Sequence, residues 1–180
     1  MKETELAESI TKAMDFNLSQ IFNEIDLKVK NIVHSKAKEI ALLPSKKQET
    51  RIIVFSEFKT QTNNLKATIS FSKVNAMMMV DLIKGAPFGT TKCVCAAEIN
   101  SLKDVSLNLF KAYINSLNSV ANTQIQLTES DAVFSFSDFE NEFVVGNNLG
   151  EGRLIELSLT VGGTNIKGEM KFFAPIQLIK

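Results

Sequence analysis

Apolar residues in the first part of the sequence recur every three or four positions, which is the period of an α-helix. The residues that follow this period are Leu6, Ile10, Met14, Leu18, Ile21, Ile25, Val29 and Ile32. They predict one long helix over residues 4–33 with an apolar stripe along one side. Because that stripe must be shielded from water, we expect the helix to pack against the rest of the molecule.

Beyond this helix the pattern changes to alternation of apolar and polar residues, which predicts two strands over residues 50–58 and 65–73. The residues between them, 60–64, favour turns, so the two strands are expected to form a hairpin. Residues 74–84 predict a short buried helix. Gly85 would end this helix, because glycine readily takes the left-handed conformation of a helix end.

The second half of the chain predicts elements of the same kinds. After a connector at 85–89, residues 101–119 predict another amphipathic helix. Its inner side carries Leu102, Val105, Leu109, Tyr113 and Leu117. Four strands are predicted after it, over residues 124–136, 141–145, 152–161 and 166–174.

Two parts of the sequence nearly repeat each other. The corresponding segments are Arg51–Phe55 with Arg153–Leu157, and Asn64–Phe71 with Asn165–Phe172. Each pair of alternating segments lies downstream of a helical pattern, so the repeat extends beyond a short string of residues. We therefore expect one pseudo-symmetric α/β domain over residues 1–180. Its first repeat would cover about 4–85 and its second about 99–178, with antiparallel strands sharing one sheet and helices packed on it.

Composition and charge narrow the classes of partner. The 20 basic and 20 acidic residues cancel, and no dense basic segment stands out, which argues against nucleic acid or an anionic membrane. Proteins or small molecules are the expected partners. The charged N-terminus has no apolar signal region, and no apolar run approaches the roughly 18 residues that span a bilayer. We therefore expect a cytoplasmic protein without membrane insertion.

Residues that commonly carry chemistry are few. Cys93 and Cys95 lie two residues apart in an apparent strand, so we expect buried or edge thiols that are too far apart for an unstrained disulfide. The one histidine, His34, is distant in sequence, so neither a metal site nor a histidine-dependent triad is expected. The eight glycines form no phosphate-binding loop.

Several short segments are similar to one protein family. Leu18–Asn23 resembles the L-x-E-I-x-N signature of the CheC/CheX/FliY group of chemotaxis phosphatases and flagellar-switch relatives, with Gln20 in place of the glutamate. Met79–Gly85 resembles the M-x-D-L-L-x-G helix of that family. Ser101–Leu107 and Ala112–Leu117 are similar to its second long helix. The resemblance covers nearly the whole chain and implies a pseudo-twofold CheC-like domain, in agreement with the internal repeat.

The resemblance also implies an activity. In such phosphatases a glutamate and an asparagine on one exposed helix face enter the active site of a phosphorylated response regulator, where one binds the partner and the other orients water. The matching residues here are Gln20 and Asn23, and Phe16 and Leu27 would flank them on the outward side of the helix and contact the partner. No cofactor of its own is implied, because Mg²⁺ would be supplied by the response regulator.

The second site that the family would place in this chain is degenerate. Asp104 is one methylene shorter than glutamate, Leu107 occupies the asparagine position, and Asn108 comes one residue late. We interpret the second helix as having lost the chemistry while retaining a surface, with Leu107 and Ile114 near an outward polar row.

Three functions stay open from the sequence. The first is a CheC/CheX-like phosphatase that acts on a phosphorylated CheY-like response regulator in chemotaxis or two-component signalling. The second is a non-catalytic binding or adaptor module of the same fold, with a flagellar-switch protein as partner. The third is an unrelated α/β protein that binds a small molecule, which only the Met77–Met79 run and the cysteines that we expect to be buried suggest. A homodimer is compatible with each of them.

Overall fold

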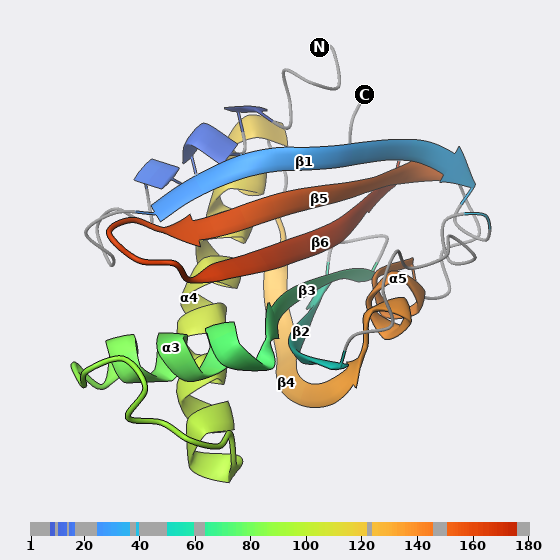
Figure 1. Ribbon diagram of the computed structural model, residues 1–180. Coiled ribbons are helices and arrows are strands. Elements are labelled where there is room, and N and C mark those ends of the chain that lie inside the picture. The colour runs from blue at the N-terminus through green and yellow to red at the C-terminus, as the bar shows by residue number, and fades with distance from the viewer. Residues whose placement is uncertain are drawn as a thin grey trace.

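The computed structural model describes residues 8–9, 11–13, 15–16, 25–36, 39, 50–59, 64–121, 124–145 and 151–175. Within these residues, six strands form one sheet in the order β1-β5-β6-β3-β2-β4, and every neighbouring pair is antiparallel (Figure 1). The strands are β1 (Ile25–Lys36), β2 (Thr50–Lys59), β3 (Asn64–Ser72), β4 (Gln126–Phe136), β5 (Glu151–Val161) and β6 (Lys167–Pro175). The helices are α3 (Lys73–Ile83), α4 (Ala96–Ala121) and α5 (Ser137–Val145).

The strand order is symmetric about its centre. Hairpin β2–β3 of the first half meets hairpin β5–β6 of the second half where β3 pairs with β6. The outer strands are exchanged, because β1 pairs with β5 and β4 pairs with β2. Each half therefore contributes a strand to the other half's side of the sheet. This arrangement confirms the expected pseudo-twofold α/β fold, in which both repeats share one sheet.

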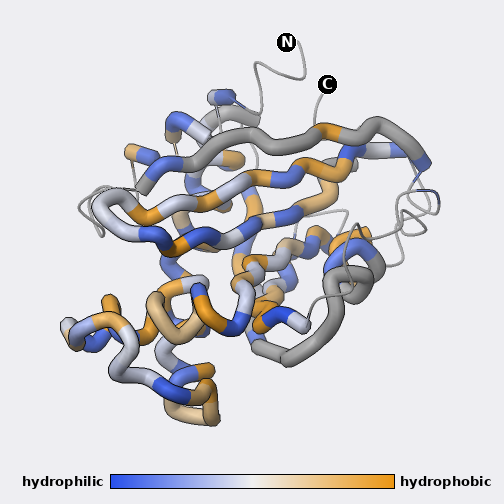
Figure 2. The backbone as a smooth tube through the Cα atoms, viewed as in Figure 1, coloured by the Kyte–Doolittle hydropathy of each residue, from blue (hydrophilic) through white to orange (hydrophobic). Residues whose placement is uncertain are grey.

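One face of the sheet is covered by α3 and α4, which enclose the main core. The predicted inner residues of the second helix are all buried there: Leu102, Val105, Leu109, Tyr113 and Leu117. The Tyr113 and Phe172 rings lie 4.4 Å apart between α4 and β6. Figure 2 shows hydrophobic and hydrophilic residues alternating along β5 and β6, as expected for strands with one apolar face. No helix within the described residues is long and apolar enough to cross a membrane.

Helix α5 covers part of the opposite face. Phe172 belongs to the main core, whereas the next residue, Phe173, packs with Val144, Val145 and Leu154 in a second cluster. Successive side chains of a strand point to opposite faces. The two clusters therefore lie on the two sides of the sheet, and α5 is the element that closes the second one.

The predicted helix over residues 4–33 is wrong in its second part. Residues 8–9, 11–13 and 15–16 are helical, but β1 begins at Ile25 and pairs with β5 along its whole length. The apolar residues in this stretch fit both periods, because Ile25, Leu27 and Val29 alternate as well as following a helical spacing. Pairing with β5 decides in favour of the strand, and a register shift after Val29 accommodates the change in spacing.

Three other predictions need correction. The strand expected over 141–145 is part of α5, in which buried residues recur at helical spacing: Glu140, Asn141, Val144 and Val145. The predicted helix 101–119 begins earlier, at Ala96, so residues 91–95 form an irregular segment and not a strand. Cys93 and Cys95 are consequently exposed free thiols and not buried or edge ones.

Other boundaries are confirmed. The strands expected over 50–58, 65–73, 152–161 and 166–174 correspond to β2, β3, β5 and β6, and the helix expected over 74–84 corresponds to α3. Gly85 follows α3 with a φ of 62°, the left-handed conformation expected from the sequence. Gly168 is required for another reason, since an added Cβ would lie 2.7 Å from Cε1 of Phe71 on the neighbouring strand.

Candidate functional site

The residues expected to form the first site are only partly described. Gln20 and Asn23 lie outside the described residues. Phe16 is helical and 70% exposed, as expected for a residue that contacts a partner. Leu27 lies in β1, opposite Leu159 of β5. The prediction that Phe16 and Leu27 share one helix face is therefore wrong, because the chain has become a strand by Ile25.

The second surface lies on the outer side of α4. Asp104 is exposed, and Leu107 and Asn108 are half-buried. Since residues three and four apart are neighbours on a helix, Asp104 lies beside both Leu107 and Asn108. Ile114, which was expected near this outward row, is only 5% exposed and belongs to the main core. This surface offers one carboxylate, one leucine and one partly accessible amide.

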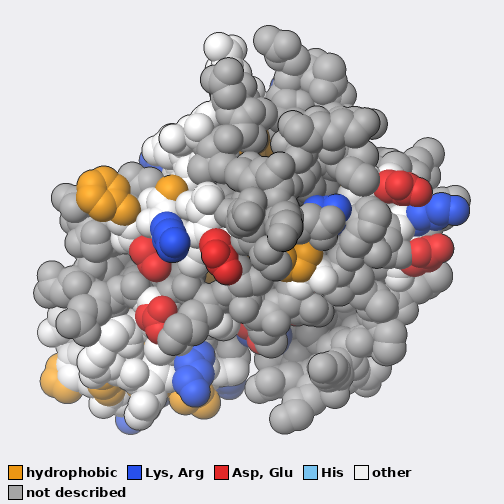
Figure 3. Space-filling view, turned by 90° about the horizontal axis from the view of Figure 1, so that it is seen from above, with side chains coloured by type: hydrophobic (Ala, Val, Ile, Leu, Met, Phe, Trp, Pro, Cys, Tyr) orange, Lys and Arg blue, Asp and Glu red, His pale blue; other side chains and the backbone are white. Residues whose placement is uncertain are grey.

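An ion pair borders this surface. Lys103 Nζ lies 2.9 Å from Asp131 Oδ1 and joins α4 to β4. Both side chains are partly exposed, so we expect the pair to contribute little to stability and more to the local pattern of charge. Figure 3 shows positive and negative side chains interspersed among the described residues on the face that it views, without a large patch of one sign.

A group of charged side chains on the α5 side of the sheet is absent from the predicted sites. The Glu140 side chain is fully buried, with Oε2 2.9 Å from Lys171 Nζ and Oε1 4.0 Å from Arg51 Nε. Lys171 is also 3.5 Å from Glu156 and donates a hydrogen bond to Asn141 Oδ1 at 3.3 Å. Burial alone would lower the pKa of Lys171, but the negative charges of Glu140 and its neighbours outweigh burial and raise that pKa.

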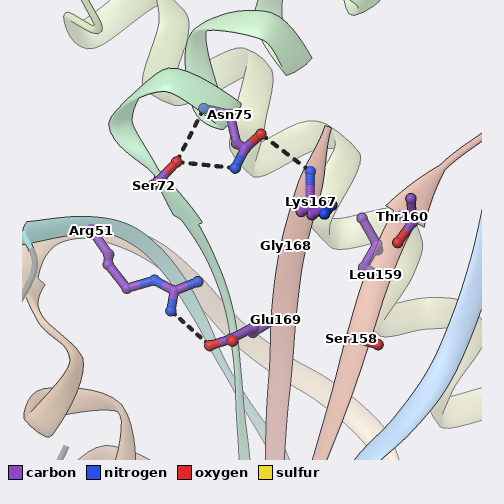
Figure 4. Close-up of a pocket in the computed structure, with 9 residues that line it drawn as sticks. All are labelled: Arg51, Ser72, Asn75, Ser158, Leu159, Thr160, Lys167, Gly168 and Glu169. Carbon is purple, nitrogen blue, oxygen red and sulfur yellow. Dashed lines mark hydrogen bonds and ion pairs between the residues drawn. The ribbon is translucent and has the colours of Figure 1, made fainter. Parts of the chain in front are cut away.

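The same face holds a polar pocket of about 280 Å³ near the start of α3 (Figure 4). Its lining residues are Arg51, Ser72, Asn75, Ser158, Leu159, Thr160, Lys167, Gly168 and Glu169. Arg51 Nη1 donates to Glu169 Oε2 at 2.6 Å, so these two charges of the lining offset each other. Asn75 donates to Ser72 Oγ and accepts a bond from the Lys167 backbone N–H, which joins α3 to β6.

This lining indicates what the pocket can bind. Hydroxyl, amide and paired ionic groups suit hydrogen bonding to a polar group, whereas the pockets that usually bind small molecules are mostly apolar with a few convergent polar groups. The sequence signal for the pocket was weak: Arg51 and Glu169 are far apart in sequence, and only the β2-β3-β6 pairing brings them together. Among the described residues, no three His, Cys, Asp or Glu side chains gather as a metal site would require.

Comparison with solved structures identifies the fold. The chain is similar to FliY of Thermotoga maritima, with a TM-score of 0.71 and 15% identity over 94% of this chain and 87% of that one. It is also similar to the middle domain of FliM from Vibrio alginolyticus, with a TM-score of 0.59 and 11% identity over 97% and 93% of the two chains. A third similar structure is the CheX-CheY-BeF₃-Mg²⁺ complex of Borrelia burgdorferi, with a TM-score of 0.53 and 10% identity over 92% and 94%.

These similarities show that the chain has the CheC/CheX/FliY-type fold, as the sequence resemblance implied. No family model matches the sequence, and neither does any curated protein. At such low identities the agreement is one of architecture. It therefore establishes the class of fold that presents the surfaces described above.

Proposed function

We propose that this protein binds a CheY-like response regulator in its phosphorylated state and hydrolyses the aspartyl phosphate. The observation that carries the proposal is the shared fold, because one structure of similar fold is a CheX-CheY complex that contains BeF₃ and Mg²⁺. The sequence adds Gln20 and Asn23 at the spacing that the resemblance assigns to the reacting side chains. The exposed Phe16 ring, a few residues earlier in the sequence, would supply an apolar contact to the partner.

The proposed chemistry needs little from this chain. The regulator's aspartyl phosphate lies beside the regulator's own Mg²⁺, which neutralises charge on the phosphoryl oxygens. An amide that holds a water molecule in line with the phosphorus lowers the barrier by positioning the nucleophile. In this proposal Asn23 holds the water, and Gln20 contacts the partner without the charge that a glutamate would bring.

A second candidate function is a non-catalytic adaptor of the flagellar-switch type. It is favoured by the outer surface of α4, where Leu107 occupies the position of the amide and Asp104 is exposed. Similarity in fold to FliY and to the middle domain of FliM also fits this candidate. An adaptor would use the same surfaces to hold a partner and would leave the phosphate intact.

The two candidates are separated by following phosphate release from a phosphorylated, Mg²⁺-bound CheY-like regulator. Hydrolysis predicts faster release with this protein present, and a loss of about 10²-fold or more in Asn23→Ala, by analogy with other single positioning groups. Asn115→Ala is the matched control, because Asn115 is an exposed asparagine on the outer side of α4. Binding without faster release would support the adaptor, and equal rates for Asn23→Ala and the wild type would exclude the proposed role of Asn23.

A further inference from the structure

The segment that leads into α4 is held at both ends. The Asp81 carboxylate accepts hydrogen bonds from the backbone N–H groups of Gly89, Thr90 and Thr91, at 2.7, 3.1 and 2.8 Å. Helix α4 begins at Ala96. The residues between these anchors, 92–95, have no regular secondary structure and therefore form a short bridge between two fixed points.

Both cysteines of the chain lie on this bridge. Cys93 and Cys95 are exposed and free, and one residue separates them. Cys95 Sγ donates to Glu98 Oε2 at 2.6 Å, and Glu98 Oε1 accepts from Lys84 Nζ at 2.8 Å. The thiol of Cys95 is thus part of a chain of contacts that runs from the first turn of α4 to the end of α3.

These contacts give the two thiols different reactivity. The hydrogen bond to Glu98 is the main cause that raises the pKa of Cys95, and the neighbouring Cys93 thiol contributes to the same shift. Because a thiolate is the form that attacks oxidants, the Cys95 thiol, whose proton is held by the Glu98 carboxylate, is poorly suited to be the first nucleophile. The first oxidation is therefore expected at Cys93, with Cys95 as the nearby thiol that can resolve it.

The geometry of the bridge permits a bond between them. Two residues span at most about 7 Å of extended chain, and disulfides join Cα atoms up to about 6.8 Å apart. A strand would hold the pair near the upper limit, but residues 91–95 are irregular and unpaired with the sheet. A disulfide across a single residue is strained, and strained, exposed disulfides are the readily reduced ones that serve as switches.

We propose that Cys93 and Cys95 form a peroxide-sensitive dithiol switch at the start of α4. The Cys93 thiolate attacks one oxygen of hydrogen peroxide, the O–O bond breaks, and Cys93 sulfenic acid and hydroxide result. The Cys95 sulfur then attacks the Cys93 sulfur, and the sulfenic hydroxyl leaves and takes a proton to form water. Overall, two thiols and one peroxide give one disulfide and two waters, and a thiol reductant reverses the change.

The switch is coupled to α4 through Glu98. Glu98 Oε2 also accepts a hydrogen bond from the Cys95 backbone N–H at 3.3 Å, so the Glu98 side chain reaches back to the residue that precedes the helix. Disulfide formation removes the thiol that donates to Glu98 and pulls the backbone of Cys95 toward Cys93. The first turn of the helix that carries Asp104 is then less well held.

Intact-mass measurement after treatment with one equivalent of hydrogen peroxide tests the bond. The proposal predicts a mass lower by about 2 Da, the two hydrogens lost, with full recovery in dithiothreitol. It also predicts faster amide hydrogen exchange over residues 96–99 of the oxidised protein and no loss of about 2 Da in Cys93→Ser or Cys95→Ser. Addition of oxygen alone, or disulfides only between molecules, would overturn the proposal.

A second measurement tests the role assigned to Glu98. In Glu98→Gln the carboxylate that holds the Cys95 proton is gone, so iodoacetamide should alkylate Cys95 faster, by about tenfold for each unit by which its pKa falls. Glu57→Gln is the control, since Glu57 pairs with Lys66 on the sheet, away from this segment. If Cys95 is alkylated at the same rate in the wild type and in Glu98→Gln, then Glu98 does not hold the Cys95 proton, and the different roles proposed for the two thiols are wrong.

Discussion

The charged cluster of Arg51, Glu140 and Lys171 beneath α5 allows the cost of one substitution to stability to be predicted. Lys171→Met would leave the buried Glu140 carboxylate without its nearest cation, which lies 2.9 Å away. Removing one partner of a buried ion pair typically costs about 3–5 kcal/mol, because the remaining charge stays uncompensated away from water. Arg51 remains 4.0 Å from Glu140 as a second cation. We therefore expect a loss near the lower end, about 3 kcal/mol.

Urea unfolding followed by circular dichroism measures this loss. With a denaturant slope of about 2 kcal/mol/M, a loss of about 3 kcal/mol lowers the unfolding midpoint by about 1.5 M. Lys66→Met is the matched control, because the Lys66–Glu57 pair has the same 2.9 Å separation but side chains that are 25% and 32% exposed. A partly exposed pair contributes about 1 kcal/mol or less, so the control should shift the midpoint far less.

A double variant tests the cause. If the cost comes from an isolated buried charge, adding Glu140→Gln to Lys171→Met should recover part of the lost stability. Equal losses in Lys171→Met and Lys66→Met would refute the reasoning. The reasoning would also be refuted if the double variant lost as much stability as the sum of the losses in the two single variants.

Two further predictions concern the sheet and the start of α4. Gly168→Ala should lower the free energy of unfolding by about 1–3 kcal/mol, because its Cβ would press on the Phe71 ring. Urea unfolding measures this loss, and an unchanged unfolding midpoint would contradict the close packing of Gly168 against Phe71. Cys95 and Lys84 lower the pKa of Glu98 from 4.5 to about 2. The Glu98 carboxylate therefore stabilises the fold above pH 4.5, and this contribution is lost as the pH falls toward about 2. Glu98→Gln should flatten the acid titration of helicity in that range, and a titration identical to the wild type would show that the contacts of Glu98 do not stabilise the fold.

Elements with one clear period could be predicted from the sequence. Both hairpins consist of short apolar-rich segments with partial alternation and turn residues between them, and their near-repetition indicated a shared, pseudo-symmetric sheet before the strand order was known. Helix α4 was predictable from its apolar side, although its first residues, 96–100, were not. Among them only Ile99 is a large apolar residue, and the contact between Cys95 and Glu98 at this end leaves no periodic signal in the sequence.

Elements with two compatible periods could not be predicted. Residues 25–33 satisfy helix and strand spacing alike, and only pairing with β5 decides between them. The buried cluster of Arg51, Glu140 and Lys171 was hidden for a related reason. Charged residues are rarely buried, and the three come from different elements that meet only in the folded sheet.

Direct binding to a receiver domain tests the central claim, which is that this fold serves to dock a phosphorylated regulator. Isothermal titration of the full chain with a CheY-like regulator would be carried out with Mg²⁺, in the presence and in the absence of beryllium fluoride, which mimics the phosphoryl group. We predict saturable binding that is at least about tenfold tighter with beryllium fluoride, equivalent to about 1.4 kcal/mol, and that is weakened by Phe16→Ala. No binding in either state, or equal affinity in both, would contradict the account.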